Sequence, residues 1–272
     1  MLKVGIVGVG NMGSKYVNKF KELGLEYVLI DSDPVKFANF PENVPKYTDL
    51  KSAIDKEDIS YLFVATSPQS HIPIANFALE NCINVMVEKP PAFDTKSLSD
   101  TIELAHKKGV YFAVSEIEIF SNIVRNIKKD NLWEKAEGYR LNLGKGYINP
   151  FYDLAWHDLY IFHYLFGSFK IKDVKVEGNY VSLDVKGSNI DLHLEVAWLN
   201  PFLKRQWHLY SKEGETILNF VEDRIHYPDN SVKEKDNIDK LRMMIDNFIK
   251  NPSYDSSYRA LDILKEVEKI KI

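Results

Sequence analysis

The sequence contains almost no cysteine and no long apolar run. Its 272 residues include one cysteine, Cys82. A single cysteine excludes a disulfide framework within the chain and fits a reducing compartment. No stretch of about 18 apolar residues occurs, so we expect no membrane-spanning helix. No charged and then apolar leader precedes the first apolar segment. These absences predict a cytoplasmic protein without membrane association.

The sequence also lacks an excess of either charge. Its 35 basic and 39 acidic residues give a formal net charge of -4. Without a basic excess, there is no bulk electrostatic reason to expect a nucleic-acid partner. Hydrophobic residues make up 45% and charged residues 27%, which is typical of a folded globular protein. The length allows one large domain or two ordinary ones.

A glycine-rich turn follows the first apolar segment, residues 2–8. Gly8, Gly10 and Gly13 form the spacing Gly-x-Gly-x-x-Gly. The first glycine permits a tight turn, the second lets the backbone approach a pyrophosphate, and the third lets a helix pack closely on a strand. The amphipathic helix expected over 11–23 would direct its free N–H groups and its dipole at the phosphates. The hexapeptide is a weak signal alone, but here a strand precedes it and a helix follows.

Asp31 ends the next apolar segment, residues 26–31. It lies 18 residues beyond Gly13, close to the ~20 expected for a carboxylate that binds the adenosine ribose hydroxyls. The alternative is that Asp31 or Asp33 only caps the helical turn that Pro34 opens. We assign the cap to Asp33 and the ribose to Asp31. Because a carboxylate there repels a 2′-phosphate, NAD is favoured over NADP.

Strand and helix patterns alternate as far as residue 115. This alternation predicts right-handed parallel crossovers and a doubly wound sheet, an α/β Rossmann domain over residues 1–117. Ligands bind at the carboxyl ends of the strands of such a sheet. The further strands are expected at 60–66, 84–88 and 110–115, and the helices at 70–81 and 94–108.

The pattern changes near residue 116. Apolar and polar residues alternate over 191–196, which marks antiparallel strands with one solvated face. Glu213-Gly214 predicts a hairpin turn. We therefore expect an α+β domain over 118–272, with a mostly antiparallel open sheet that serves substrate binding or oligomerisation, and a last helix that can pack back on the first domain. Its strands are expected at 134–143, 170–178, 179–186, 190–198, 204–211 and 215–221, and its helices at 119–130, 151–166, 236–250 and 254–270.

In combination, these motifs resemble the glucose–fructose oxidoreductase / inositol 2-dehydrogenase (Gfo/Idh/MocA-like) family of nicotinamide enzymes. The resemblance implies a homodimeric or homotetrameric NAD(P)-dependent oxidoreductase. It would transfer hydride between the cofactor and a secondary hydroxyl or ketone of a sugar, cyclitol or other polyol. The matching segments are Gly8 to Gly13, Asp31, Thr66-Ser67-Pro68 with His71, Glu88-Lys89-Pro90, and Asp153 with His157. The implied cofactor-binding residues are Gly8, Gly10, Asn11, Met12, Gly13, Asp31, Thr66, Ser67, Pro68, His71, Glu88 and Lys89.

The resemblance implies three catalytic residues: Lys89, His157 and Asp153. The lysine of this motif lies beside the nicotinamide in the family, where an ammonium can stabilise negative charge on the substrate oxygen. Asp153 and His157 are four residues apart and share one face of a helix, so the carboxylate could orient the imidazole as a general base. Without the resemblance, the four-residue spacing alone would favour the alternative, in which His157 is a surface or packed histidine. Asp158 and His163 do not share that face, and we expect no metal site.

The sequence departs from the family pattern at two points. Many members carry an arginine and an aromatic residue after the sixth strand, whereas this chain has Glu116 and Glu118 there. That difference favours a neutral or cationic polyol over a phosphorylated or carboxylate substrate. The family's aspartate three residues beyond the histidine is replaced by Tyr160. Two other functions stay open: reduction of an imine or a tetrapyrrole-like substrate, and a non-catalytic dinucleotide-binding sensor.

Overall fold

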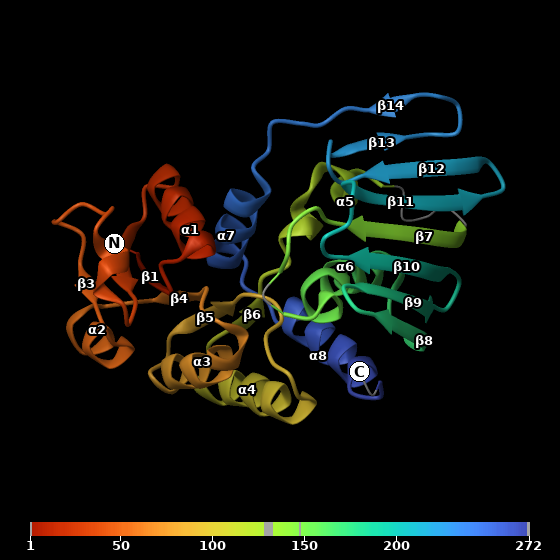
Figure 1. Ribbon diagram of the computed structural model, residues 1–272. Coiled ribbons are helices and arrows are strands. Elements are labelled where there is room, and N and C mark those ends of the chain that lie inside the picture. The colour runs from red at the N-terminus through yellow and green to blue at the C-terminus, as the bar shows by residue number, and fades with distance from the viewer. Residues whose placement is uncertain (1, 128–132, 147, 271–272) are drawn as a thin grey trace. The chain divides into compact units, whose positions relative to one another are not determined.

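The structure is a computed structural model that describes residues 2–127, 133–146 and 148–270 (Figure 1). Contacts divide the chain into two compact units, each with its own sheet. The first unit comprises Met1–Ser115 with Leu241–Leu261, and the second comprises Glu116–Lys240 with Asp262–Ile272. Among the described residues, no helix has both the length and the apolar character needed to cross a bilayer.

The first unit contains a six-stranded parallel sheet in the order β3-β2-β1-β4-β5-β6. The strand order reverses between β1 and β4, which is where ligands bind in doubly wound sheets. After their first residue, the central strands β1 and β4 are buried and contain no charged side chain, as strands covered on both faces require. The predicted Rossmann architecture is confirmed. The strands are β1 (Lys3–Val7), β2 (Glu26–Ile30), β3 (Lys46–Tyr47), β4 (Tyr61–Val64), β5 (Asn84–Val87) and β6 (Phe112–Val114).

The three helices predicted in this unit are present, and their ends lie within one residue of the expected bounds. Asp94 caps the fourth helix through the Ser97 N–H, and Gly109 ends it in the left-handed region. The short strand β3 and the second helix were not predicted, because a two-residue strand has no periodicity. Figure 1 shows α1 and α7 on one side of the sheet and α3 and α4 on the other. The helices are α1 (Asn11–Glu22), α2 (Leu50–Lys56), α3 (His71–Glu80) and α4 (Thr95–Lys108).

Two C-terminal helices, α7 (Lys240–Lys250) and α8 (Asp255–Val267), contribute to the first unit. The ring of Phe248 packs edge-on against Tyr61 and Phe63, with centroids 5.5 and 5.8 Å apart. Ser257 donates a hydrogen bond to the Phe112 carbonyl at the sheet edge. From the sequence, both helices were expected in the second domain, with only the last one packing back on the first.

The second unit contains an eight-stranded sheet in the order β14-β13-β12-β11-β7-β10-β9-β8. Among the described strands of this sheet, only β7 and β10 pair in parallel, so the predicted mostly antiparallel sheet is confirmed. The predicted hairpin joins β11 and β12. Strands β13 and β14 were not predicted. The bounds are β7 (Trp133–Leu141), β8 (Lys170–Glu177), β9 (Tyr180–Lys186), β10 (Asp191–Ala197), β11 (Lys204–Ser211), β12 (Gly214–Asn219), β13 (Arg224–His226) and β14 (Val232–Lys233).

The helical segments of the second unit differ from the predictions in detail. The helix predicted over 119–130 is instead a 3₁₀ turn, η3 (Ile117–Phe120), followed by α5 (Asn122–Asn126). Ser121 separates the two because its side chain caps α5; residues 128–132 lie outside the described part. The helix predicted over 151–166 begins as a π-helical turn, η4 (Phe151–Ala155), and continues as α6 (Trp156–Phe166).

Candidate active site

The three glycines of the first turn meet three different steric conditions. Gly8 has φ +88°, and a Cβ there would lie 2.7 Å from the Ala65 carbonyl oxygen. A Cβ on Gly13 would lie 1.9 Å from the Gly8 carbonyl oxygen, so only glycine lets α1 approach β1 this closely. No atom lies within 4 Å of a Cβ built on Gly10. The turn therefore leaves open space at the N-terminus of α1, where a pyrophosphate would approach.

Asn11 and Met12 form the opening of α1. This helix has no side-chain cap at Gly10 and no acidic residue in its first turn. Its first N–H groups and the positive end of its dipole therefore meet no negative side chain of the helix itself. This arrangement fits the diphosphate of a dinucleotide.

Asp31 is held beside the glycine turn. Its Oδ2 accepts the Val9 N–H at 2.7 Å, and its Oδ1 accepts the Asp33 N–H at 3.0 Å. Asp33 in turn accepts the Val35 N–H at 3.0 Å and caps the 3₁₀ turn η1 (Pro34–Phe37). The predicted cap at Asp33 is thus confirmed. Because a carboxylate oxygen accepts more than one hydrogen bond, Asp31 retains the capacity to accept ribose hydroxyls.

Glu88 is positioned by a tyrosine that sequence reasoning missed. Tyr16 on α1 donates to Glu88 Oε1 at 2.7 Å and lies 3.2 Å from Ser115 Oγ. Burial, followed by the Glu88 charge, raises the pKa of the Tyr16 phenol well above its ordinary value, so the hydroxyl remains a donor. The signal for this pair was available, because a tyrosine on the apolar face of a helix usually finds a partner for its hydroxyl. Lys89 follows directly, and its bond to Pro90 is cis.

His71 joins the loops that follow β4 and β5. Its buried ring places Nδ1 3.0 Å from the Pro90 carbonyl oxygen and Nε2 3.1 Å from that of Thr66. Burial lowers the pKa of His71 below its ordinary 6.5, against the opposing effect of the two carbonyl groups. His71 therefore links the Thr66-Ser67-Pro68 loop to the loop that carries Lys89.

The lowered pKa of His71 makes stability depend on pH. The unfolded chain binds the His71 proton below about pH 6.5 while the folded chain resists it, so the free energy of unfolding should fall as pH drops from 7 to 5. The loss is up to about 1.4 kcal/mol for each unit of pKa lowering. Urea titrations of the parent and of His71→Gln should show a stability difference that narrows at low pH. A gap that stays constant or widens would contradict this, and His226→Gln serves as the control.

A buried ion pair lies in the second unit. Arg140 Nε is 2.6 Å from Asp158 Oδ2 and Nη2 is 3.2 Å from Oδ1, with side-chain exposures of 3% and 1%. Trp207 Nε1 donates to Asp158 Oδ1 at 2.8 Å. Burial opposes the charge of Arg140, but the Asp158 carboxylate outweighs it and raises the pKa of the guanidinium. Asp158, which sequence analysis considered as a metal ligand, is therefore engaged in the fold.

His157 is the second residue of α6, and its Nδ1 lies 2.9 Å from the Tyr160 hydroxyl. Tyr160 is fully buried and accepts the Glu118 N–H at 3.1 Å. In the sequence, Tyr160 is recognisable only as a departure from the family pattern. Its spacing of three residues from His157 is the signal that the two side chains are neighbours on the helix.

Asp153 lies in the π-helical turn η4, not in a regular α-helical turn. Asn149 begins this turn, since its Oδ1 accepts the Phe151 N–H at 2.8 Å and its carbonyl accepts the Asp153 N–H at 3.1 Å. Single π turns inside helices are frequent at functional sites. The catalytic role of Asp153 stays a prediction. Within residues 2–127, 133–146 and 148–270, no three His, Cys, Asp or Glu side chains are placed to hold a metal ion.

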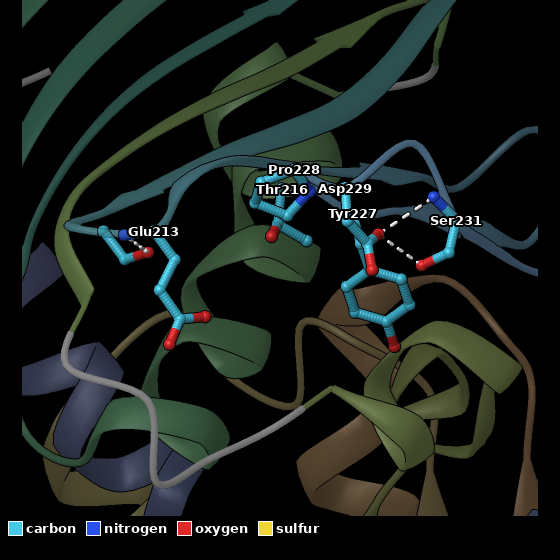
Figure 2. Close-up of a pocket in the computed structure, with 7 residues that line it drawn as sticks. Glu213, Thr216, Tyr227, Pro228, Asp229 and Ser231 are labelled. Carbon is cyan, nitrogen blue, oxygen red and sulfur yellow. Dashed lines mark hydrogen bonds between the residues drawn. The ribbon is translucent and has the colours of Figure 1, made fainter.

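A cavity of about 500 Å³ occurs at the ends of the β11–β12 and β13–β14 hairpins (Figure 2). Asp229 at its edge accepts hydrogen bonds from the Ser231 N–H and Oγ, so its carboxylate closes a turn. No predicted site residue lines it, and its hydroxyl and carboxylate groups all belong to the hairpin ends. The lining consists of Ser211, Glu213, Thr216, Tyr227, Pro228, Asp229 and Ser231.

Comparison with known proteins matches residues 2–116 to the family described as "Oxidoreductase family, NAD-binding Rossmann fold". Inositol 2-dehydrogenase of Corynebacterium glutamicum (strain R) is 28% identical over 157 residues, which are 55% of this chain and 46% of that protein. The chain thus spans about half the length of this curated relative. The family match confirms the predicted cofactor class, NAD.

Solved structures share the fold of the whole chain. UDP-N-acetylglucosamine 3-dehydrogenase GnnA from Acidithiobacillus ferrooxidans superposes with a TM-score of 0.87 at 16% identity, covering 99% of this chain and 96% of that one. The WlbA dehydrogenase from Bordetella pertussis, solved with NADH and UDP-GlcNAcA, gives 0.82 at 14% identity over 98% and 94%. The family match therefore identifies residues 2–116 as an NAD-binding Rossmann domain of this oxidoreductase family, and the superpositions show that the whole chain shares the fold of these dehydrogenases.

Proposed function

We propose that the protein is an NAD-dependent oxidoreductase that acts on a secondary hydroxyl, or the corresponding ketone, of a sugar, cyclitol or sugar derivative. One observation carries the proposal. The open turn at Gly10, the carboxylate of Asp31 and the Glu88-Lys89 pair follow three strands of a single parallel sheet, each at its carboxyl end. A dinucleotide binds along this edge in doubly wound folds.

The residues of the first unit bind and orient the cofactor. The N-terminus of α1 holds the pyrophosphate, and Asp31 accepts the adenosine ribose hydroxyls. NAD, when bound, supplies the group that accepts or gives the hydride. Glu88, fixed by Tyr16, orients the neighbouring Lys89. Lys89 and His157 serve proton transfer and stabilisation of the substrate oxygen, with Asp153 supporting His157.

A neutral polyol is the proposed substrate class. The names of the relatives support a sugar-like molecule, because they include an inositol dehydrogenase and a nucleotide-sugar dehydrogenase. The acids at positions 116 and 118 argue against an anionic group nearby. Glu118 already pairs with Lys240 at 2.7 Å, so its charge is compensated within the protein and does not require a cationic substrate. Turnover of polyols, aldoses, inositols and nucleotide sugars, followed by NADH fluorescence, tests this proposal.

Asp31 should make the protein prefer NADH over NADPH. The thermal unfolding midpoint of the parent should rise more with NADH than with NADPH, because the cofactor that binds more tightly stabilises the folded chain more. A ligand at 100 times its Kd adds about 2.7 kcal/mol of stability. Asp31→Ser should reduce this rise and narrow the difference between the two cofactors. Asp33→Ala is the matched control, since it removes the cap of η1 but not the ribose ligand. A larger shift with NADPH in the parent would refute the assignment.

The quaternary structure and location follow from the same proposal. We propose a homodimer or homotetramer, which sedimentation velocity would distinguish from a monomer. A domain boundary near residue 117 and a cytoplasmic location stay predictions.

A further inference from the structure

The cavity at the hairpin ends of the second unit continues the buried face of the eight-stranded sheet (Figure 2). Side chains two residues apart in an extended chain lie on the same face. Thr216 therefore shares a face with Leu218, and Tyr227 shares one with Ile225. Leu218 and Ile225 are register partners and are both fully buried. Beyond this apolar pair, the same face carries hydroxyl groups and borders a cavity of about 500 Å³.

Thr216 brings an unsatisfied hydroxyl to this cavity. Its residue is only 2% exposed. Within residues 2–127, 133–146 and 148–270, no hydrogen-bond partner of its side chain occurs. Because a buried hydroxyl requires a partner, the partner of Thr216 has to be a molecule that occupies the cavity.

Two further side chains border the cavity from opposite turns. Figure 2 shows Glu213 on one side of Thr216 and Tyr227 on the other. Burial, followed by the charge of Asp229, raises the pKa of the Tyr227 phenol, so this hydroxyl remains a hydrogen donor at neutral pH. The Asp229 carboxylate already accepts from Ser231. The groups left for a ligand are therefore two hydroxyls, one carboxylate and one aromatic ring.

These groups discriminate between classes of ligand. The described lining contains no lysine, arginine or histidine, so an anion would meet the carboxylates of Glu213 and Asp229 without a counter-charge. An ammonium group donates hydrogen bonds but cannot accept them, so it would leave the hydrogens of both hydroxyls without acceptors. A sugar or polyol hydroxyl both donates and accepts. The cavity volume also falls within the range of about 300–1,000 Å³ that is typical of small-molecule sites.

We propose that this cavity is a binding site for a neutral sugar or polyol. The hydroxyls of Thr216 and Tyr227 and the carboxylate of Glu213 bind ligand hydroxyls, and the Tyr227 ring packs against the apolar face of the ligand. None of the lining residues is among those proposed to bind the cofactor or to act in catalysis. The inference therefore does not depend on the function proposed above.

Threonine methyl spectra test the site in the cofactor-free full chain. The sequence has five threonines, and Thr216 is the only one beyond residue 101. With ¹³C-methyl threonine, D-glucose or myo-inositol should shift the Thr216 signal in a saturable manner, and Thr216→Val assigns that signal. Thr66, in the proposed cofactor site, should not shift. A shift of Thr66 without one of Thr216 would overturn the proposal.

A tyrosine variant tests the contact with the ligand. Tyr227→Phe removes one hydrogen bond to the ligand and should raise its Kd about tenfold, as measured from the Thr216 signal. Tyr210→Phe is the matched control, since its hydroxyl bonds to Glu137 and it does not line the cavity. Equal Kd values in the two variants would contradict the proposed contact. Glu213→Gln, at an exposed turn position, provides a second variant that leaves the buried face intact and should also weaken binding.

Other probes decide the class of occupant. Spermidine or inorganic phosphate should not shift the Thr216 signal, and saturation by either one at a lower concentration than the polyols would refute a neutral ligand. No shift with D-glucose or myo-inositol at about 100 mM, enough to saturate a millimolar site, would show that only water fills the cavity. A Thr216 signal that changes with protein concentration but not with polyol would assign the cavity to a contact between copies of the chain and refute the sugar site.

Discussion

Replacing Lys89 with methionine is expected to lower kcat by about 10²–10³-fold, the loss typical of removing one group that stabilises charge in the transition state. Methionine retains the length and apolar stem of lysine but has no ammonium. The cofactor contacts of the glycine turn and of Asp31 lie on other strands of the sheet, so the thermal shift with NADH should remain close to that of the parent.

The comparison needs a substrate from the polyol screen and a control lysine. Lys96 suits this purpose, because its side chain is 83% exposed and pairs with Asp100 one helical turn away. Exposed pairs of this kind contribute little, and Lys96→Met should change kcat less than twofold. If Lys89→Met turns over substrate at the parent rate, Lys89 is not part of the chemistry. If it binds no NADH, its role is in cofactor binding.

The second large effect concerns stability. Asp158→Ala should lower the free energy of unfolding of the second unit by about 3–5 kcal/mol, because it leaves the Arg140 guanidinium buried without a counter-charge. The Trp207 indole would also lose the acceptor of its N–H. All four tryptophans belong to the second unit, so urea unfolding followed by tryptophan fluorescence reports on this unit.

Two further variants make the ion-pair prediction specific. In Arg140→Met/Asp158→Leu both charges are removed together. Much of the free energy of unfolding that Asp158→Ala loses should be recovered in this double variant, because apolar residues of similar size often replace a buried pair at little cost. Asp191→Ala breaks an exposed pair with Lys186 in the same unit and should change the free energy of unfolding by less than about 1 kcal/mol. A double variant less stable than Asp158→Ala would contradict the explanation.

The two predictions concern different kinds of residue. Lys89 could be identified from its own sequence neighbours, because it stands between Glu88 and Pro90 at a strand end. The Arg140–Asp158 pair could not, since no local pattern joins a residue in the middle of a strand to one on a helix 18 positions later. Such a pair is visible only after β7 and α6 pack against each other.

Where a prediction of the fold was wrong, the local signal was short or was overridden. A two-residue strand such as β3 exists only because β2 offers an edge to pair with. The helix expected near residue 119 is interrupted by Ser121, whose side chain caps the next turn. The C-terminal helices followed the antiparallel strands in sequence and were assigned to them. Apolar faces such as that of Phe248 do not reveal which sheet they will cover.

The sequence by itself determined the features that depend on short-range chemistry. The apolar runs of buried strands, the glycine turn, the acid at the end of β2 and the cap at Asp33 are each encoded within a few residues. The steric limit at Gly13, which meets the Gly8 carbonyl oxygen, and the satisfaction of backbone N–H groups act over a few residues, so they can be predicted from the sequence alone.

Only the tertiary structure decided which polar groups meet in the interior. Tyr16 meets Glu88 across 72 positions, and Tyr160 meets the backbone of Glu118 across 42. A buried hydroxyl must find a partner, but its identity depends on which elements pack together. The orientation of Glu88 and the partner of the Tyr160 hydroxyl therefore depend on contacts made by folding, because the sequence identifies the acid and the tyrosine but not the groups that hold them.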